Sequence, residues 1–338
     1  MPGASLPPRP VRSPRPLTPE NVLQAVRRGE ARALGEGGVK TTALAIPATD
    51  GVPLAASFYA PAVDGPATGT IVIASATGVR RHYYDAFARA LAGEGFRVVT
   101  FDYRGIGGSR PASLRGYAAT ARQWGERDLE GVLAWTGERF RGDRRLLVAH
   151  SIGGQLLGLA PSAATLDGAL FVGSQIGYWG LFEVPWKWLF AFVMHVAMPG
   201  LVRALGYFPA SRLGAGEDLP AGVALEWAAW CRDPAYYFAH GVAREGFDRL
   251  RLPLLALSIG DDAIAPRRAS RALVSHYRNT ASEERVVTPA DVGLSRIGHF
   301  GWFRAALGDR LWPPAIAWLR GVAAGTPRAA ASAPESEP

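Results

Sequence analysis

The chain has 338 residues and a net charge of +8, with 48% hydrophobic and 20% charged residues. A chain of this length buries a core in one large domain or two smaller ones. The positive charge is carried by arginine, because Lys40 and Lys187 are the only lysines, and the arginines are scattered singly or in pairs. No basic block is interleaved with aromatic residues, so the charge indicates a solvated arginine-rich surface and excludes nucleic acid as the expected partner.

The cysteine content and the two ends of the chain exclude further classes of protein. Cys231 is the only cysteine, which excludes an intrachain disulfide and a cysteine metal cluster, and its aromatic surroundings predict a core position. Residues 1–18 and 323–338 are rich in proline, serine, arginine or alanine and are predicted to be disordered tails. The N-terminal stretch lacks the apolar segment of a secretory signal, so we expect a cytoplasmic protein.

Strands and helices alternate along most of the chain. Helical spacing predicts helices at residues 19–34, 84–91, 122–140, 267–277 and 315–322. Strands are predicted at residues 41–47, 53–59, 70–74, 96–101, 146–150, 166–172, 253–259 and 284–288. The first two strands are joined by a turn at Asp50-Gly51. This order predicts an α/β fold, a mainly parallel sheet with helices on both faces.

The alternation is interrupted between two parts of this α/β core, residues 19–176 and 246–322. Residues 177–245 show no strand pattern and predict a helical insertion, which holds five of the ten tryptophans. Its run 186–205 is apolar but broken by charged residues and proline, and indicates a buried or cleft-lining helix pair rather than a membrane anchor. His195 in this run could be a satisfied buried histidine or could contact substrate, and the first interpretation is preferred.

The stretch 146–154 carries the clearest chemical signal. An apolar strand ends in Ser151, and the glycines that follow it lead into a helix. A serine at such a sharp turn presents its hydroxyl as a nucleophile, and the turn needs small residues two positions before and after it. These positions hold Ala149 and Gly153, so the usual glycine is replaced at the first of them.

A serine nucleophile needs a base, and the base needs a carboxylate that orients it. Asp261 and Asp262 directly follow the predicted strand 253–259; we favour Asp262, although both could instead cap the next helix. His299 lies between glycines in a late loop and is the candidate base. His150 adjoins the serine, but its side chain should point to the opposite face, which indicates a structural role.

Backbone amides are expected to bind the oxyanion of the reaction. One belongs to Ile152, the residue after the nucleophile. The other comes from the loop after the first central strand; Thr77 is favoured and Ala76 is the alternative. The stretch Gly105–Gly108 lacks the third glycine of a dinucleotide loop, and no histidine–carboxylate cluster has metal spacing. The sequence therefore predicts neither a metal nor another cofactor.

These motifs occur in one order: the Thr77-Gly78 loop, Asp102-Tyr103-Arg104-Gly105-Ile106-Gly107-Gly108-Ser109, Ala149-His150-Ser151-Ile152-Gly153, Asp262 and His299. In this order the chain resembles the α/β-hydrolase superfamily over residues 41–322. It is most similar to bacterial predicted α/β hydrolases related to serine aminopeptidase and lysophospholipase-like enzymes. Three stretches, 219–222, 227–231 and 298–301, support that placement more weakly. The resemblance implies the α/β-hydrolase fold, a Ser151–His299–Asp262 triad and a helical cap.

Two positions depart from the pattern of the superfamily. Ala149 replaces the first elbow glycine, and Ser75-Ala76 replaces the usual His-Gly before the oxyanion loop. The predicted activity is hydrolysis of a carboxylic ester, or else of a thioester or amide, through an acyl-enzyme. The tryptophan-rich insertion favours a small-molecule substrate with an apolar acyl group. The alternatives are an acyltransferase on the same triad, a non-catalytic binding protein with this fold, and a lipase at a membrane surface, where contact is not favoured.

Overall fold

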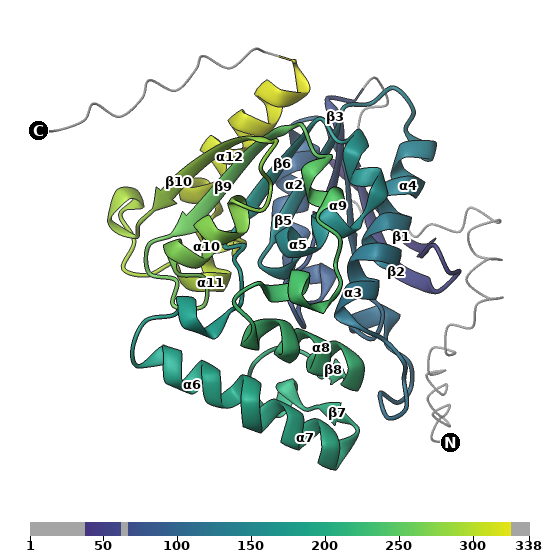
Figure 1. The fold of residues 1–338 in the computed structure, drawn as a ribbon. Helices are drawn as coiled ribbons and strands as arrows, with labels where there is room; N and C mark the ends of the chain where they lie inside the picture. Colours follow the sequence, from purple (N-terminus) through teal and green to yellow (C-terminus); the bar gives the residue numbers. More distant parts are fainter. Residues whose placement is uncertain (1–37, 62–66, 326–338) are drawn as a thin grey trace, which may run out of the picture.

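The computed structural model describes residues 38–61 and 67–325 (Figure 1). The predicted tail 1–18, the predicted helix 19–34 and most of the predicted tail 323–338 lie outside the described residues. Residues 323–325 end the last helix and the turn that follows it.

An eight-stranded sheet forms the centre of the fold, in the order β1-β2-β4-β3-β5-β6-β9-β10. The strands are β1 (Val39–Pro47), β2 (Pro53–Pro61), β3 (Gly69–Ala74), β4 (Phe96–Phe101), β5 (Arg145–His150), β6 (Gly168–Val172), β9 (Pro253–Ile259) and β10 (Ala281–Val287). β2 runs antiparallel to both of its neighbours, and all pairs from β4 to β10 are parallel. The predicted, mainly parallel sheet is confirmed.

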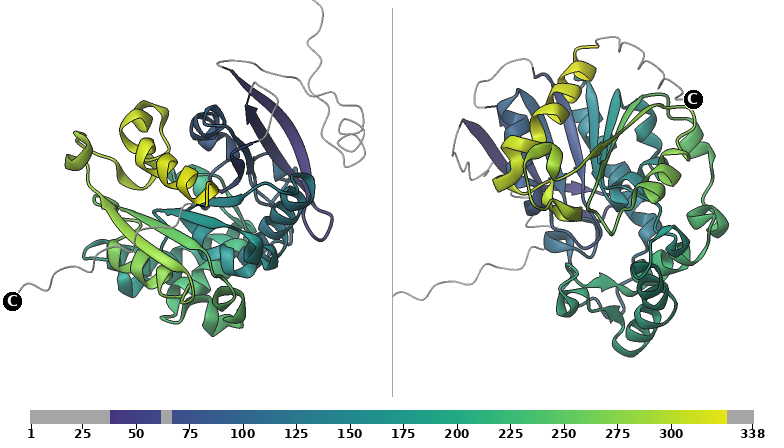
Figure 2. Two further views of the ribbon diagram at one scale, coloured as in Figure 1. Left: turned by 90° about the horizontal axis from the view of Figure 1, so that it is seen from above. Right: turned by 90° about the vertical axis from the view of Figure 1, so that its left-hand side faces the viewer.

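Helices cover both faces of this sheet (Figures 1 and 2). The helices of the described residues, those of the insertion included, are α2 (Asp85–Gly93), α3 (Ala121–Gln123), α4 (Glu130–Arg139), α5 (Ile152–Leu156), α6 (Trp186–Phe192), α7 (Met198–Leu205), α8 (Ala221–Arg232), α9 (Glu245–Asp248), α10 (Arg267–Val274), α11 (Gly298–Gly301) and α12 (Gly308–Ala323). The expected helix 122–140 is observed as α3 and α4, which are joined by a wide helical turn. Thr120 caps the start of α3: its hydroxyl accepts the Gln123 amide, and the Gln123 side chain accepts the Thr120 amide.

Two hydrophobic clusters fill the spaces between the sheet and its helices. Residues along β3 alternate between them: Ile71 and Ile73 pack with α2 and α12, whereas Val72 and Ala74 pack with α4 and α5. Successive side chains of a strand point to opposite faces, so both faces of this central strand are buried. This arrangement explains the continuous apolar runs of the central strands.

The insertion between β6 and β9 holds α6, α7 and α8, which lie together beyond one end of the strands, below the sheet in Figure 1. The prediction that residues 177–245 hold no strand was wrong, because β7 (Tyr207–Phe208) pairs with β8 (Leu219–Pro220). Two-residue strands have no alternation that a sequence pattern could reveal.

The stretch 186–205 also differs from its prediction. α6 and α7 form one continuous helical stretch rather than a helix pair, and most of its side chains are only partly buried or exposed. His195 is exposed on it and bonds the Ala191 carbonyl through Nδ1, so its interpretation as a buried residue was wrong. Hydropathy describes how apolar a helix is and carries no information on which of its faces meets the core.

Candidate active site

Ser151 occupies a strained turn between β5 and α5. Its backbone angles are φ 53° and ψ −117°, and Tyr236 is the other non-glycine residue with positive φ among residues 38–61 and 67–325. Left-handed backbone at a residue with a Cβ costs on the order of 1–3 kcal/mol and persists where the surroundings enforce it. The turn has the strand-to-helix geometry of a nucleophile elbow.

Close packing around the turn explains the small residues beside Ser151. A Cβ on Gly153 would lie 2.6 Å from the Ala74 carbonyl oxygen, and one on Gly154 would lie 2.6 Å from Ser174 Oγ. Ala149 is fully buried within β5, where its methyl group is accommodated. Glycine is therefore needed after the serine, whereas alanine is tolerated before it.

Asp262 and His299 form a buried pair. The carboxylate Oδ2 of Asp262 lies 2.7 Å from Nδ1 of His299, and Oδ1 accepts the amides of Ile264 and Ala265, each at 2.9 Å. Both residues are nearly buried, at 5% and 6% exposure. These contacts fix the carboxylate and leave Nε2 as the ring nitrogen of His299 that is free of Asp262.

Asp261, the alternative acid, has a different position. Its two carboxylate oxygens accept the amides of Ile297 at 2.9 Å and Gly298 at 2.8 Å. Asp261 therefore anchors the backbone of the loop that presents His299, while Asp262 contacts the imidazole itself.

The carboxyl ends of β5, β6 and β9 bring the candidate residues to one edge of the sheet. The Ser151 amide donates a 3.2 Å hydrogen bond to the Val172 carbonyl, at the end of β6. A Cβ on the next residue, Gly173, would lie 3.3 Å from Asp262 Oδ2 and 3.4 Å from His299 Nδ1. Residue 173 is a glycine, so no side chain stands between the turn of Ser151 and the Asp262–His299 pair. Ligands of open parallel sheets bind at this edge.

The candidate oxyanion donors differ in their hydrogen bonding. The Ala76 amide donates to the hydroxyl of Tyr84 at 2.9 Å and is therefore occupied. Within the part of the chain that the structure describes, the amides of Thr77 and Ile152 donate no hydrogen bond. The two favoured amides are thus the free ones.

His150 lies beneath the site and has no contact with solvent. The Tyr84 hydroxyl bonds Nδ1 at 2.9 Å, and Nε2 lies 3.0 Å from the carbonyl oxygen of His299. Burial, together with His299 nearby, holds the pKa of His150 well below its usual range, so the ring is neutral. A neutral ring that donates from Nε2 to the carbonyl accepts at Nδ1 from Tyr84. The interpretation of His150 as structural agrees with these contacts.

Tyr84 was missed at the sequence level. Its hydroxyl joins the oxyanion loop, through Ala76, to His150 and so to the backbone of His299. The sequence placed Tyr84 only among the regularly spaced apolar residues of the predicted helix 84–91. This spacing does not distinguish a tyrosine that uses its hydroxyl from a phenylalanine. A hydroxyl at a fully buried position would have been the available signal.

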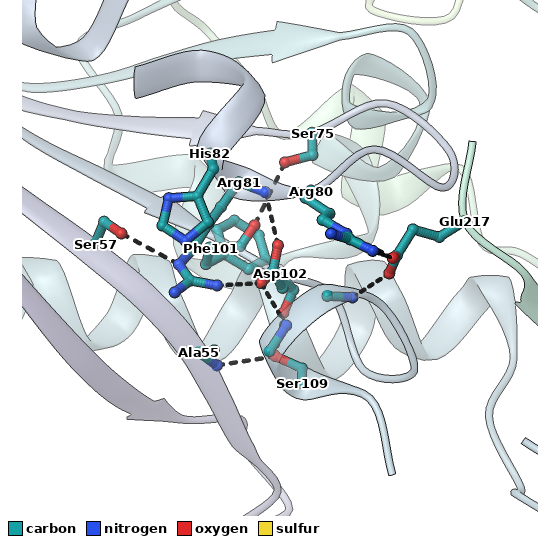
Figure 3. Close-up of polar contacts among 12 residues, drawn as sticks. Ala55, Ser57, Ser75, Arg80, Arg81, His82, Phe101, Asp102, Ser109 and Glu217 are labelled. Carbon is teal, nitrogen blue, oxygen red and sulfur yellow. Dashed lines mark hydrogen bonds and ion pairs between the residues drawn. The ribbon is translucent and has the colours of Figure 1, made fainter. Parts of the chain in front are cut away.

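The stretch 102–109 is tied to the sheet by Asp102, as Figure 3 shows. Asp102 accepts the amides of Arg81 at 2.6 Å and Gly108 at 2.8 Å, and it pairs with the Arg81 guanidinium. The Ser109 hydroxyl donates to the Asp102 carbonyl at 2.7 Å and accepts from the Ala55 amide at 2.8 Å. These residues of the motif hold the turn in place and do not contact Ser151 or His299.

Arg104 in the same motif is buried between two carboxylates. It bonds Asp128 and, through two 2.8 Å bonds, Asp50 of the β1–β2 turn. Burial raises the pKa of Asp128 to about 6, against the opposing effect of Arg104. The Arg104 guanidinium therefore joins the turn 102–109 to the β1–β2 hairpin through Asp50 and to the helical turn between α3 and α4 through Asp128.

One residue of the insertion contacts the oxyanion loop. The carboxylate of Glu217 accepts the Gly107 amide at 2.6 Å and pairs with the Arg80 guanidinium (Figure 3). Its own amide donates to the Gly78 carbonyl at 2.8 Å. No sequence motif marked this glutamate, because its partners lie more than a hundred residues earlier in the chain.

The order of the sheet and the strand-to-helix turn at Ser151 are those of the α/β-hydrolase fold. The sequence model of the family described as serine aminopeptidase, S33, matches residues 65–213. This match supports a hydrolase and agrees with the predicted resemblance. The comparison with curated protein sequences gives no match.

Solved structures share the fold at low sequence identity. A hypothetical protein of Pseudomonas aeruginosa is 14% identical, with a TM-score of 0.56 over 84% of this chain and 94% of its own. A thermophilic esterase of Thermogutta terrifontis is 18% identical, with a TM-score of 0.52 over 83% and 99%. A monoacylglycerol lipase of Paleococcus ferrophilus is 16% identical, with a TM-score of 0.51 over 80% and 99%.

Proposed function

We propose that the protein is a serine hydrolase that cleaves a carboxylic ester of a small molecule through an acyl-enzyme. The single observation that carries this proposal is the buried Asp262–His299 pair, bonded at 2.7 Å beside the strained turn of Ser151. A carboxylate on Nδ1 fixes the tautomer in which Nε2 is a base. The family match and the esterases and lipase among the similar folds support ester chemistry.

The proposed reaction has two halves. Ser151 Oγ attacks the acyl carbon while His299 Nε2 accepts its proton, and the amides of Thr77 and Ile152 bind the oxyanion. His299 then gives the proton to the departing alcohol, which leaves the acyl group on Ser151. Water attacks this acyl-enzyme by the same route and releases the acid. Asp262 stabilises the imidazolium formed in each half.

We propose further that the insertion acts as a cap and that the acyl group is apolar. The Tyr236 hydroxyl of the insertion donates to Gln155 Oε1 on α5 at 2.8 Å and accepts from Trp227 Nε1 at 3.1 Å. Aromatic residues of the insertion therefore pack within one helical turn of Ser151. Apolar walls of this kind favour apolar substrate groups and exclude water.

The test combines active-site labelling with an ester panel. A fluorophosphonate probe should label the wild type and the Ser275→Ala control, which changes an exposed serine, but not Ser151→Ala. Esters of increasing acyl length should be hydrolysed by the first two proteins and not by the third. Unlabelled wild type without turnover of any ester would contradict the proposal and favour a binding protein. Product formation that requires an added alcohol or amine would identify an acyltransferase instead.

A further inference from the structure

The helical stretch α6–α7 presents an apolar face to solvent. Among residues 38–61 and 67–325, it is the one helix long and apolar enough to cross a membrane. Six large apolar side chains just before it or in its first eleven residues are more than half exposed: Val184, Trp186, Trp188, Leu189, Phe192 and Val196. Four of them, from Trp188 to Val196, follow the helical spacing of three to four residues and so share one face. We call these four the outer face.

The opposite side of the same stretch is also apolar, and it packs on the protein. Met194, Met198 and Val202 are buried in the core cluster, and the Arg232 guanidinium of α8 bonds the Met194 carbonyl at 3.4 Å. A helix at the surface of a water-soluble domain normally turns polar residues outward. The apolar composition of the outer face is therefore typical of a surface that binds a membrane or another protein.

The charges along the helical stretch and the loop after it are positive, and the acid Glu183 lies directly before them. Between residues 184 and 216 the chain has Lys187, Arg203 and Arg212 and no aspartate or glutamate. The Lys187 ammonium lies 5.3 Å and 5.5 Å from the ring centroids of Trp179 and Trp188. Tryptophan and lysine side chains together are typical of segments that sit among lipid headgroups, and cations are attracted to anionic lipids.

We propose that the outer face docks on an anionic lipid surface, with α6–α7 lying in the plane of the headgroups. The stretch of 20 residues would lie along the surface for about 30 Å at 1.5 Å per residue. Its inner side packs on α8 and the core cluster, so lipid reaches one face only. The geometry thus favours a helix that lies on the membrane over one that spans it.

A second copy of the chain is the other candidate partner for an apolar face. A two-fold pairing of this helix with itself in antiparallel orientation brings the Lys187 end of one copy to the Arg203 end of the other. Like charges would then meet at both ends of the contact, where Glu183 is the one acid beside two cations, so the net charge at each end stays positive. The charge pattern therefore favours lipid over self-association.

Docking would place the insertion between the membrane and the sheet edge that carries Ser151. Its consequence for the substrate rests on the proposed function: esters dissolved in the membrane would reach the site from the lipid side. The binding itself does not depend on catalysis, so the two proposals can fail separately.

Co-sedimentation with vesicles tests the docking. The wild type and Ser151→Ala should both sediment with phosphatidylcholine vesicles that contain phosphatidylglycerol. The double variant Trp188→Ser/Phe192→Ser should bind at least about tenfold more weakly. Val286→Ser, which changes an exposed apolar residue of β10, is the matched control and should bind like the wild type. Lys187→Glu should weaken binding to the anionic vesicles, and added salt should do the same for the wild type.

Two results would overturn the docking. One is a wild type that stays in the supernatant with anionic and neutral vesicles alike. The other is a wild-type dimer in size-exclusion chromatography that the double variant dissociates, without vesicle binding, which would identify a second copy as the partner. Hydrolysis of a water-soluble ester by the double variant at the wild-type rate shows that the variant is folded.

Discussion

The amide of Glu217 donates a hydrogen bond of 2.8 Å to the carbonyl oxygen of Gly78. This bond joins the insertion directly to the loop that carries Thr77. The contact is close along the backbone, since a Cβ on Gly216 would lie 2.8 Å from the same carbonyl oxygen. The position of the proposed oxyanion donor thus depends on the insertion as well as on the sheet.

Replacement of Glu217 tests this dependence. Glu217→Ala removes the acceptor of Gly107 and the partner of Arg80, and we expect the acylation rate to fall by about tenfold, since small displacements of reacting groups reduce rates strongly. KM should change little. The measurement is single-turnover release of the alcohol from a chromogenic ester. Glu226→Gln, whose carboxylate contacts the Arg122 amide away from the loop, is the control. Equal rates for Glu217→Ala and the wild type would refute a role for the Glu217 carboxylate in positioning the loop.

The two adjacent aspartates should give different variants. Asp262→Asn keeps the shape of the side chain but favours the wrong tautomer of His299, and kcat should fall by about 10⁴-fold. Asp261→Asn should mainly lower the free energy of unfolding, because it weakens the bonds to the amides of Ile297 and Gly298. Steady-state kinetics and thermal unfolding of both variants make the comparison. A larger loss of kcat in Asp261→Asn would reverse the assignment.

Tyr84→Phe should lower stability. The variant leaves the buried Ala76 amide and His150 Nδ1 without a partner, at a cost of about 1–3 kcal/mol for each unsatisfied group. A freed Ala76 amide also loosens the oxyanion loop, so kcat should fall too. Denaturant unfolding and ester turnover measure the two effects. Tyr207→Phe, at a partly buried tyrosine of β7, should match the wild type in both. An unchanged free energy of unfolding in Tyr84→Phe would contradict this account.

His150 makes stability depend on pH. Its pKa in the folded protein is well below 6.5, so as the pH falls below 6.5 the unfolded chain binds a proton that the folded chain does not. The free energy of unfolding should therefore decrease on acidification, by up to about 1.4 kcal/mol per pH unit for this group. In His150→Gln, urea unfolding across this range should show a smaller slope.

A second histidine adds to the same slope. Burial, with Arg244 and Arg278 nearby, lowers the pKa of His276 to about 4, so it acts with the same sign between pH 6.5 and 4. Variants of each histidine and of both should separate the two contributions. His240→Gln, at an exposed histidine, serves as control. A steeper slope in His150→Gln than in the wild type would contradict the expected sign of the pH dependence.

The sequence was most informative where one physical cause dominates. β4 and β9 begin and end at the predicted residues, because strands buried on both faces are mostly apolar along their whole length. α12 begins seven residues before its prediction at Ala315, since its first turns include two prolines that a spacing rule treats as a boundary. Local pattern thus places elements better than it places their ends.

For the candidate site, too, the sequence predicted some features and could not predict others. The order of Ser151, Asp262 and His299 in the chain could be read from motifs, and their roles stay predictions. Sequence could not separate Asp262 from Asp261, because the two differ only in the direction that the backbone gives each side chain. The contacts of Glu217 could not be predicted either, since they join segments that meet only in the folded chain.

The connection from β6 to β9 has a consequence for engineering. β6 and β9 are adjacent parallel strands, paired from Ala169↔Leu254 to Val172↔Leu257, although some eighty residues separate them in the chain. The intervening segment therefore leaves the sheet and returns to it at neighbouring positions, and no hydrogen bond between the two strands depends on its content. It is a module that could be exchanged with that of another protein of this fold, provided that the graft keeps an acceptor for the Gly107 amide. Such chimaeras would change the segment beside the carboxyl edge of the sheet while the sheet and its helices remain in place.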